Sequence, residues 1–183
     1  VTITATQDPG PINSGPINLT AQFSEAVTGF TVGDISATNG SVSNFVAVDG
    51  DTYTFDITSP SETVTADING SVAKDAAGNN NTAASQWSIV FDNTRPTVTI
   101  TANQDPGPTN DSTINMTAQF SENVTGFLSG DITVSNGIVS NFAAVDGDTY
   151  TFDITPSTGT VTADIAGSVA QDAAGNVNTA ASQ

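Results

Sequence analysis

The chain contains neither cysteine nor histidine. Without cysteine it can form no disulfide and no thiolate metal site, and without histidine it lacks the commonest general base and zinc ligand. Most familiar catalytic arrangements are therefore excluded, and the sequence predicts a protein that is not an enzyme. Glycoside hydrolysis by two carboxylates remains possible in principle, but no pair of acids is marked out for it.

Positive charge is also nearly missing. Lys and Arg together number 2 against 19 Asp and Glu, which gives a formal net charge of -17. Such a chain repels phosphate backbones and anionic membrane surfaces, so we expect no nucleic-acid partner. Hard cations bind through several oxygen ligands, so the excess of carboxylates indicates calcium as the cofactor, or a salty habitat.

Long apolar runs are absent as well. No stretch of about 18 apolar residues occurs, so we expect no membrane insertion. The chain opens on Val1 without a signal-like stretch. We therefore expect a piece of a longer, extracellular or cell-surface (secreted) protein whose secretion signal lies elsewhere.

A tandem repeat organises what is present. At an offset of 97, residues 1–86 align with residues 98–183 without a gap, and 21 of the 86 pairs differ. A period near 100 residues is that of a whole seven-stranded sandwich domain rather than of a solenoid repeat. We expect a first domain over residues 1–93, a short link over 94–97 and a second domain over 98–183.

Alternating hydrophobicity predicts β-structure throughout. Ile17, Leu19, Ala21 and Phe23 alternate with polar residues, the pattern of a half-buried strand. Four further stretches show the same alternation, with apolar positions at Val1, Ile3 and Ala5, at Tyr53, Phe55 and Ile57, at Val64, Ala66 and Ile68, and at Trp87, Ile89 and Phe91. The lone Trp87 thus belongs to the core rather than to a sugar-stacking surface.

Two less regular strands are expected between Phe30 and Val48. Gly33 and Asp34 interrupt the first as a bulge would, and Asn39-Gly40 marks the turn between the two. Asp49-Gly50 lies between two alternating runs, a strong hairpin signal. Seven strands result, and the fold class is all-β: two tandem immunoglobulin-like seven-stranded sandwiches.

The second copy lacks a counterpart of the Trp87 to Phe91 stretch, so we expect it to miss its last strand. Alternatively, this stretch is the first strand of the second copy, which would leave the first copy incomplete. The first and last strands lie side by side in such folds, so both assignments stay open.

Several motifs resemble the bacterial Ig-like domain family, whose repeats are strung along large surface proteins and adhesins. They are residues 23–30, 33–35, 53–55 and 75–79, with counterparts at 120–127, 130–132, 150–152 and 172–176. The resemblance implies a non-catalytic module whose partners are neighbouring copies of the same repeat. It also implies that calcium at domain junctions can make such repeats rigid.

Topology predicts which oxygen ligands can meet. In a seven-stranded sandwich, alternate loops gather at the same pole, so the loops after the second, fourth and sixth strands of the second copy meet the link. This predicts a calcium site. Asp92, Glu122 and Asp172 are the first candidates, and the full predicted set is Asp8, Asp92, Asn93, Glu122, Asp172 and Asn176. Asp146 and Asp148 reach the same pole, and Arg95 weakens the hypothesis because it brings a cation close.

Some candidate groups have simpler explanations. The Asp75 to Asn79 motif is typical of a turn in which Asp75 accepts backbone hydrogen bonds and Gly78 supplies a positive φ. The Asp49-Gly50-Asp51 motif is typical of a hairpin turn. It is not an EF-hand loop, because the downstream Glu of an EF-hand is missing. An amide crosslink from Lys74 is not expected, since Lys74 borders a turn and is replaced by Gln171 in the second copy.

Two functions fit this sequence. The first is a structural spacer or stalk of a large bacterial extracellular repeat protein or adhesin, made rigid by calcium at the junction. The second is a ligand-binding module that grips a glycan or a cell-surface ligand through the loops at one pole. Exposed aromatic side chains or a groove would favour the second.

Overall fold

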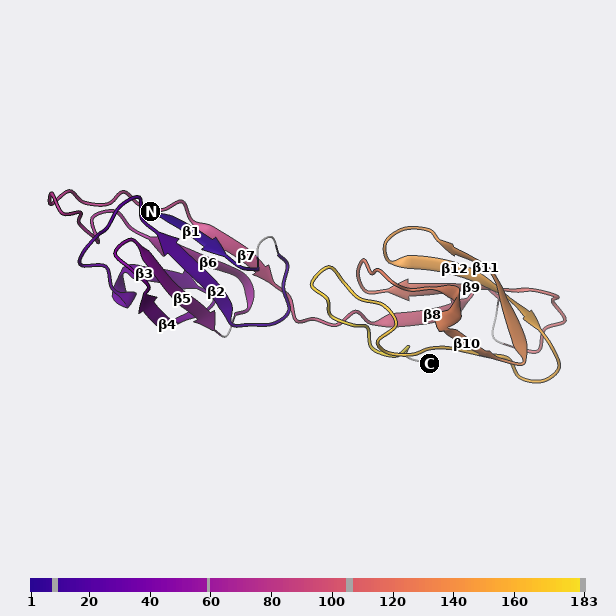
Figure 1. Ribbon diagram of the computed structural model, residues 1–183. Coiled ribbons are helices and arrows are strands. Elements are labelled where there is room, and N and C mark those ends of the chain that lie inside the picture. Colours follow the sequence, from indigo (N-terminus) through magenta and orange to yellow (C-terminus); the bar gives the residue numbers. More distant parts are fainter. Residues whose placement is uncertain (8–9, 59, 105–106, 182–183) are drawn as a thin grey trace. The chain divides into compact units, whose positions relative to one another are not determined.

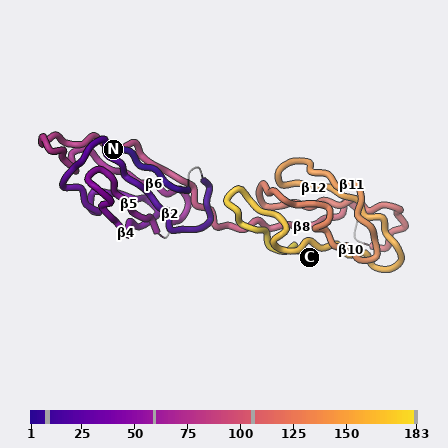
Figure 2. Tube along the Cα trace, viewed as in Figure 1, coloured from indigo at the N-terminus to yellow at the C-terminus, as the bar shows by residue number. Residues whose placement is uncertain are grey.

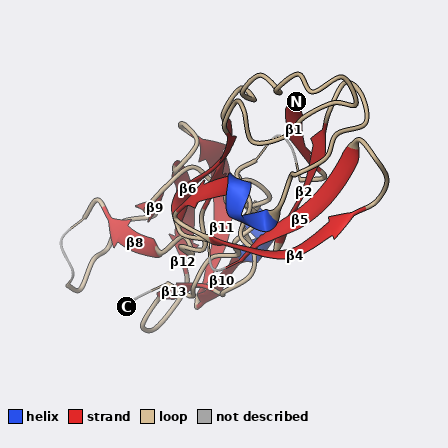
Figure 3. Cartoon of the chain, turned by 90° about the vertical axis from the view of Figure 1, so that its left-hand side faces the viewer, coloured by secondary structure: helices blue, strands red, loops and turns tan. Residues whose placement is uncertain are grey.

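The structure is a computed structural model that describes residues 1–183 apart from residues 8–9, 59, 105–106 and 182–183 (Figure 1). The chain divides into two compact units, Val1–Asn93 and Thr94–Gln183. Strands dominate both units, and the helical elements among the described residues are two short 3-10 turns (Figure 3).

The first unit is a sandwich of two antiparallel sheets. One sheet has the strand order β1-β2-β5-β4 and the other the order β3-β6-β7. The strands are β1 (Thr2–Ala5), β2 (Ile17–Gln22), β3 (Ile35–Thr38), β4 (Ser41–Ala47), β5 (Thr52–Thr58), β6 (Glu62–Ile68) and β7 (Trp87–Phe91). The seven predicted strands are confirmed.

The alternation in the sequence is the reason for these strands. Along β2 the apolar side chains of Ile17, Leu19 and Ala21 are at most 1% exposed, while Asn18 and Gln22 face solvent. Along β5 and β6 the burial alternates in the same way. Side chains on successive strand residues point to opposite faces, so each strand presents one apolar row to the space between the sheets.

Aromatic rings fill one end of the core. Phe30 lies against Phe23, Phe45 and Tyr53 in edge-on contacts with centroid distances of 5.0 to 5.7 Å. Such pairs contribute about 0.5–1.5 kcal/mol each beyond the area they bury. The second unit repeats the cluster around Phe127.

The β7 strand belongs to the first unit. It pairs antiparallel with β6, from Glu62 opposite Phe91 to Ala66 opposite Trp87. On its other side Ile12 forms a parallel bridge with Phe91, so β7 is held along both edges. Trp87 is 7% exposed, which confirms its predicted place in the core.

The predicted bulge at Gly33-Asp34 was wrong. These residues form a 3-10 turn, η1 (Val32–Asp34), in which the Asp34 carboxylate accepts a hydrogen bond from the Thr31 amide at 2.8 Å. The irregularity lies in β4, between Ser43 and Val46, where Asn44 has φ 49°. Asn tolerates this left-handed conformation, and its Nδ2 donates to Asp56 Oδ2 at 2.8 Å.

The second unit repeats this plan with six strands among its described residues. Its sheets have the orders β11-β12-β9-β8 and β10-β13. The elements are β8 (Val98–Ala102), β9 (Ile114–Phe120), η2 (Ser129–Asp131), β10 (Ile132–Ser135), β11 (Gly137–Ala144), β12 (Thr149–Pro156) and β13 (Thr162–Ile165). The positions that correspond to β7 at the offset of 97 would follow Gln183, the last residue of the sequence.

Candidate metal centre

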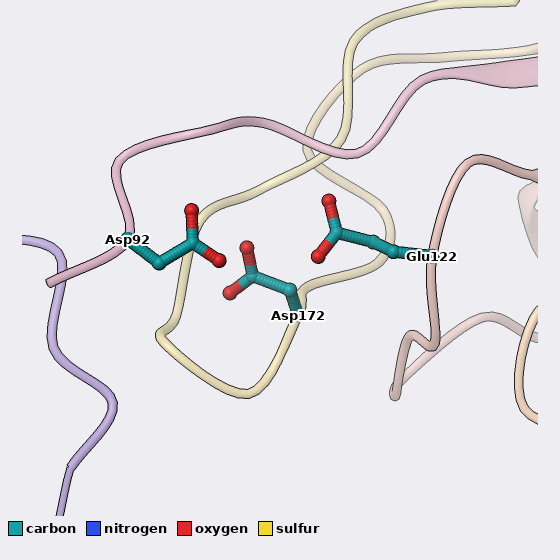
Figure 4. Close-up of side chains that lie close together, drawn as sticks. All are labelled: Asp92, Glu122 and Asp172. Atoms are coloured by element: carbon teal, nitrogen blue, oxygen red, sulfur yellow. The ribbon is translucent and has the colours of Figure 1, made fainter. Parts of the chain in front are cut away.

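Three carboxylates gather where the chain leads into the second unit. Asp92 follows β7, Glu122 follows β9 and Asp172 follows β13. One carboxylate oxygen of each lies within 4.8 Å of the others, and Figure 4 shows the side chains pointing toward one another. These are the three first candidates of the sequence analysis, brought together from positions up to 80 residues apart.

Residues 92–97 form the link segment between β7 and β8, and hydrogen bonds fix its last part, residues 95–97, to two loops of the second unit. Figure 2 lets the reader follow this link segment along the trace. The Thr97 amide donates to Ser121 Oγ at 3.0 Å, and the Ser121 amide donates to the Thr97 carbonyl at 2.9 Å. The Thr179 amide donates to the Pro96 carbonyl at 2.8 Å. The loops that carry Glu122 and Asp172 are thereby held beside the start of β8.

Arg95 adds two bonds to the second of these loops. Its Nε donates to the Val177 carbonyl at 2.8 Å, and its Nη2 donates to the Asn178 carbonyl at 3.0 Å. A planar guanidinium suits this paired contact. The cation is therefore engaged by backbone carbonyls, a role that the sequence analysis did not foresee for Arg95.

Asp172 is held in place by its own turn. Its Oδ1 accepts from the Asn176 amide at 2.9 Å and its Oδ2 accepts from Asn176 Nδ2 at 2.8 Å. Gly175, at φ 88°, supplies the left-handed residue of the turn. The Asp75 to Asn79 turn of the first unit has the same bonds, so its predicted turn chemistry is confirmed.

Burial distinguishes the two copies of this turn. Asp172 and Asn176 are 5% and 8% exposed, whereas Asp75 is half-buried and Asn79 is exposed. Hydrogen bonds lower the pKa of Asp75, chiefly those from the Asn79 side chain and amide. Each carboxylate oxygen has two lone pairs, so an oxygen that accepts one hydrogen bond can still coordinate a cation.

Asn178 supports the whole loop and was missed by sequence reasoning. It is fully buried, its Oδ1 accepts from the Val169 and Ala170 amides at 2.9 Å each, and its Nδ2 donates to the Ala166 and Thr179 carbonyls. Asn81 makes the equivalent bonds in the first unit. The sequence signal was an Asn two residues after the Asp-Ala-Ala-Gly-Asn motif in both copies.

The remaining predicted ligands differ in their positions and contacts. Asp8 lies outside the described residues. Asn93 is exposed and contributes no carboxylate, and Asn176 is present as the hydrogen-bond partner of Asp172. Asp146 belongs to a hairpin turn, where its Oδ1 accepts hydrogen bonds from the Asp148 and Thr149 amides. Hydrogen bonding by the Thr149 side chain, and then by the Asp148 amide, lowers the pKa of Asp146.

The donor set fits a hard cation. Three carboxylates offer up to six oxygens and no nitrogen or sulfur, and calcium takes six to eight oxygen ligands. Zinc and other borderline metals prefer His and Cys, which the chain lacks. Without a cation, three negative charges this close together repel one another.

Aromatic side chains offer no binding platform. All 12 aromatic residues lie in the described part of the chain, and each is buried or half-buried there. Among the residues that the structure describes, seven large apolar side chains are exposed, and every one is aliphatic. Stacking on sugar rings would need exposed aromatic faces.

Two immunoglobulin-like sandwiches in tandem, with acids gathered in the loops beside the link, define the chain as a tandem Ig-like repeat protein. The family model described as "Bacterial Ig-like domain" matches residues 1–90 and 92–183. The chain belongs to this family, and the resemblance seen in the sequence is confirmed. All three clustered acids fall within the second match.

Among solved structures, that of FdeC, an Escherichia coli adhesin, resembles the chain with a TM-score of 0.47 and 12% sequence identity. The similarity covers 99% of this chain and 63% of the FdeC chain, so the chain spans less than two thirds of that structure. None of the curated proteins compared with the chain matches it. Within the described residues no helix is long and apolar enough to cross a membrane.

Proposed function

We propose that the chain is a structural spacer of a bacterial extracellular repeat protein or adhesin, without catalytic activity. In this role tandem sandwiches carry another part of the protein away from the cell surface, and neighbouring copies of the repeat are their partners. The family assignment supports this class of function. Burial of every aromatic ring favours it over a glycan-binding module.

The link segment is the observation that carries this proposal. Five hydrogen bonds join residues 95–97 to loops of the second unit. This part of the link is therefore held rigidly on the second unit. Three residues, 92–94, lie between β7 and this anchored part, and the first of them is held by the hydrogen bond from the Asp92 amide to the Ile12 carbonyl. A spacer needs a short tether of this kind, whereas independently moving domains are joined by long flexible ones.

Calcium at the three carboxylates would shorten the tether further. Asp92 belongs to the tether, while Glu122 and Asp172 belong to anchored loops of the second unit. An ion bound by all three would therefore join the tether to these loops and relieve the repulsion between the acids. Because the Asp92 amide is already bonded to the Ile12 carbonyl, the segment 92–94 would then bend less.

Amide ¹⁵N relaxation of the full chain tests the spacer function. We expect the two units to share one rotational correlation time in calcium, and to tumble more independently when a chelator is present. Insertion of Gly-Ser-Gly-Ser between Asn93 and Thr94 should separate the two correlation times under both conditions. Independent tumbling of the unmodified chain in calcium, equal to that of the insertion variant, would contradict the proposal.

A further inference from the structure

Three Asn-Gly pairs occur in the chain, at residues 39–40, 69–70 and 136–137. In such a pair the backbone nitrogen of the glycine can attack the amide carbon of the Asn side chain, because glycine has no side chain that hinders the approach. Formation of this five-membered ring requires an Asn side chain that can turn and a glycine amide that is accessible. The structure differs at the three pairs in both requirements.

The first pair is held on both sides. Asn39 Nδ2 donates to the Thr63 carbonyl at 2.8 Å, and the Asn39 carbonyl accepts from the Ser61 amide at 3.2 Å. Gly40 is half-buried, and the side chain of Ile57 occupies the space where a Cβ would lie. The two groups that would have to meet are therefore fixed by different neighbours.

The third pair is held in the same way. Asn136 Nδ2 donates to the Thr160 carbonyl at 2.7 Å, and the Asn136 carbonyl accepts from the Ser157 amide at 2.8 Å. Gly137 is half-buried against the side chain of Ile154. This pair is the counterpart of the first pair in the second unit, and its contacts repeat those of the first pair.

The second pair is open. Asn69 follows β6, and Asn69, Gly70 and Ser71 are all exposed. Within the part of the chain that the structure describes, neither the Asn69 side chain nor the Gly70 amide forms a hydrogen bond. The Asn69 carbonyl alone is engaged, and it accepts from Asn81 Nδ2 at 3.0 Å. The Asn69 side chain can therefore turn toward the Gly70 nitrogen without breaking a contact.

The local sequence does not distinguish the first two pairs. Residues 39–41 and residues 69–71 both read Asn-Gly-Ser, so a difference in their reactivity has to come from the fold. At Asn39 a hydrogen bond and a packed glycine must open before the ring can form, and the reaction is slowed by the small fraction of time that this region is open. At Asn69 no such opening is needed.

Two Asp-Gly pairs, at residues 49–50 and 146–147, could form the same ring. In each, Oδ1 of the Asp accepts hydrogen bonds from two backbone amides of its own hairpin. An ionised carboxylate is also a poorer target for a nucleophile than a neutral amide. These pairs are therefore expected to react more slowly than Asn69.

We propose that Asn69 is a modification site, which in the folded chain deamidates without an enzyme to aspartate and isoaspartate. The Gly70 nitrogen forms a bond to Cγ of Asn69, and the bond from Cγ to Nδ2 breaks. Ammonia leaves with the proton of the Gly70 amide. Water then opens the ring. Hydrolysis of the bond between Cγ and the ring nitrogen gives aspartate, and hydrolysis at the main-chain carbonyl gives isoaspartate.

The isoaspartate form changes the loop that follows β6. Its main chain runs through Cβ and Cγ and is one carbon longer, and the carbonyl that accepts from Asn81 becomes a free carboxylate. Asn81 also holds the amides of Val72 and Ala73, and its carbonyl accepts from the Ser71 amide at 3.0 Å. We therefore expect residues 70–82 to loosen and the first unit to lose stability as the protein ages. This inference does not rest on the spacer function.

Incubation of the full chain under mildly alkaline conditions, folded and in guanidinium chloride, tests the proposal. Cleavage after aromatic residues places the three Asn-Gly pairs on separate peptides, and liquid chromatography with mass spectrometry resolves their Asn, Asp and isoaspartate forms. In the folded chain we expect Asn69 to convert at least about tenfold faster than Asn39 or Asn136. In the denaturant Asn69 and Asn39 should convert at rates within about twofold of each other, because their local sequences are identical.

The matched variant is Asn69→Ala, because the second unit has Ala166 at this position. It should abolish the fast conversion in its peptide. Urea unfolding followed by Trp87 fluorescence should show a lower midpoint for aged than for fresh wild type, and no change on ageing Asn69→Ala. Equal rates at Asn69 and Asn39 in the folded chain, or the same ratio of rates with and without denaturant, would overturn the proposal. An unchanged midpoint in extensively converted wild type would overturn the loosening of the loop.

Discussion

Arg95 donates a hydrogen bond from Nε to the carbonyl of Val177 at 2.8 Å, across 82 residues of sequence. The Arg95→Ala variant loses this bond and the one from Nη2 to Asn178. Because the side chain is exposed, we expect the free energy of unfolding of the second unit to fall by about 1 kcal/mol. Urea unfolding followed by NMR, unit by unit, measures this change.

The only other basic residue gives the matched control for that variant. Lys74 is exposed and lies in the first unit. Lys74→Ala should leave the second unit unchanged. Equal stability of the second unit in wild type and Arg95→Ala would show that Arg95 does not fasten the link segment.

Removal of the Asn178 side chain should be more costly. Asn178→Ala leaves the amides of Val169 and Ala170 without their buried acceptor, and such loss costs about 3 kcal/mol. We expect the second unit to unfold at lower urea by NMR, while the fluorescence of Trp87 reports an unchanged first unit. The control variant Asn110→Ala changes an exposed side chain and should leave the free energy of unfolding unchanged. A loss below about 0.5 kcal/mol for Asn178→Ala would contradict the assigned role.

Carboxylates held by hydrogen bonds should make the protein less stable in acid. The side chains of Asn141 and then Asn115 hold the pKa of Asp153 below its ordinary value of 3.8. A lowered pKa in the folded state stabilises the fold above the unfolded-state pKa, and that contribution is lost as the pH falls through the folded-state value.

Carboxyl ¹³C titration of Asp153 measures this effect. In Asn141→Ala we expect the Asp153 pKa to rise toward 3.8, and the loss of stability below pH 4 to become shallower. An unchanged titration curve in that variant would show that Asn141 does not set the Asp153 pKa.

A matched pair of glycine substitutions tests the difference between the two cores. Gly10→Ala forces Ile89 to move and should destabilise the first unit by about 1–3 kcal/mol. Gly107→Ala meets open space and should leave the second unit within about 0.5 kcal/mol of wild type. Trp87 fluorescence during urea unfolding reports the first unit, and NMR reports the second. Equal effects at the two positions would contradict this difference in packing around the two glycines.

Alternation made the strands predictable, because each strand has one buried face. The sandwich topology also predicted that Glu122 and Asp172 would meet, since they follow β9 and β13, two strands of the second unit that end at the same pole. Calcium binding there stays a prediction. Arg95 was read only as a nearby charge, because a single sequence does not show which carbonyls a long side chain will reach.

Local irregularities were harder to predict. Gly33 and Asp34 suggested a bulge, but the Asp34 carboxylate can close a 3-10 turn by capping the Thr31 amide. The bulge lies instead at Asn44, whose side-chain amide donates a hydrogen bond to Asp56 on the neighbouring strand. Asn178 was missed because a buried loop Asn looks like any other turn Asn until its four partners are folded around it.

Calcium titration by calorimetry of three proteins tests the central claim most directly. They are the wild type, Glu122→Gln and the matched variant Glu25→Gln, which changes the counterpart acid in the first unit. We predict saturable binding by the wild type and by Glu25→Gln, and at least about tenfold weaker binding by Glu122→Gln, because only Glu122 belongs to the three-carboxylate cluster. No heat from the wild type, or equal affinity in all three proteins, would contradict a calcium-stiffened spacer.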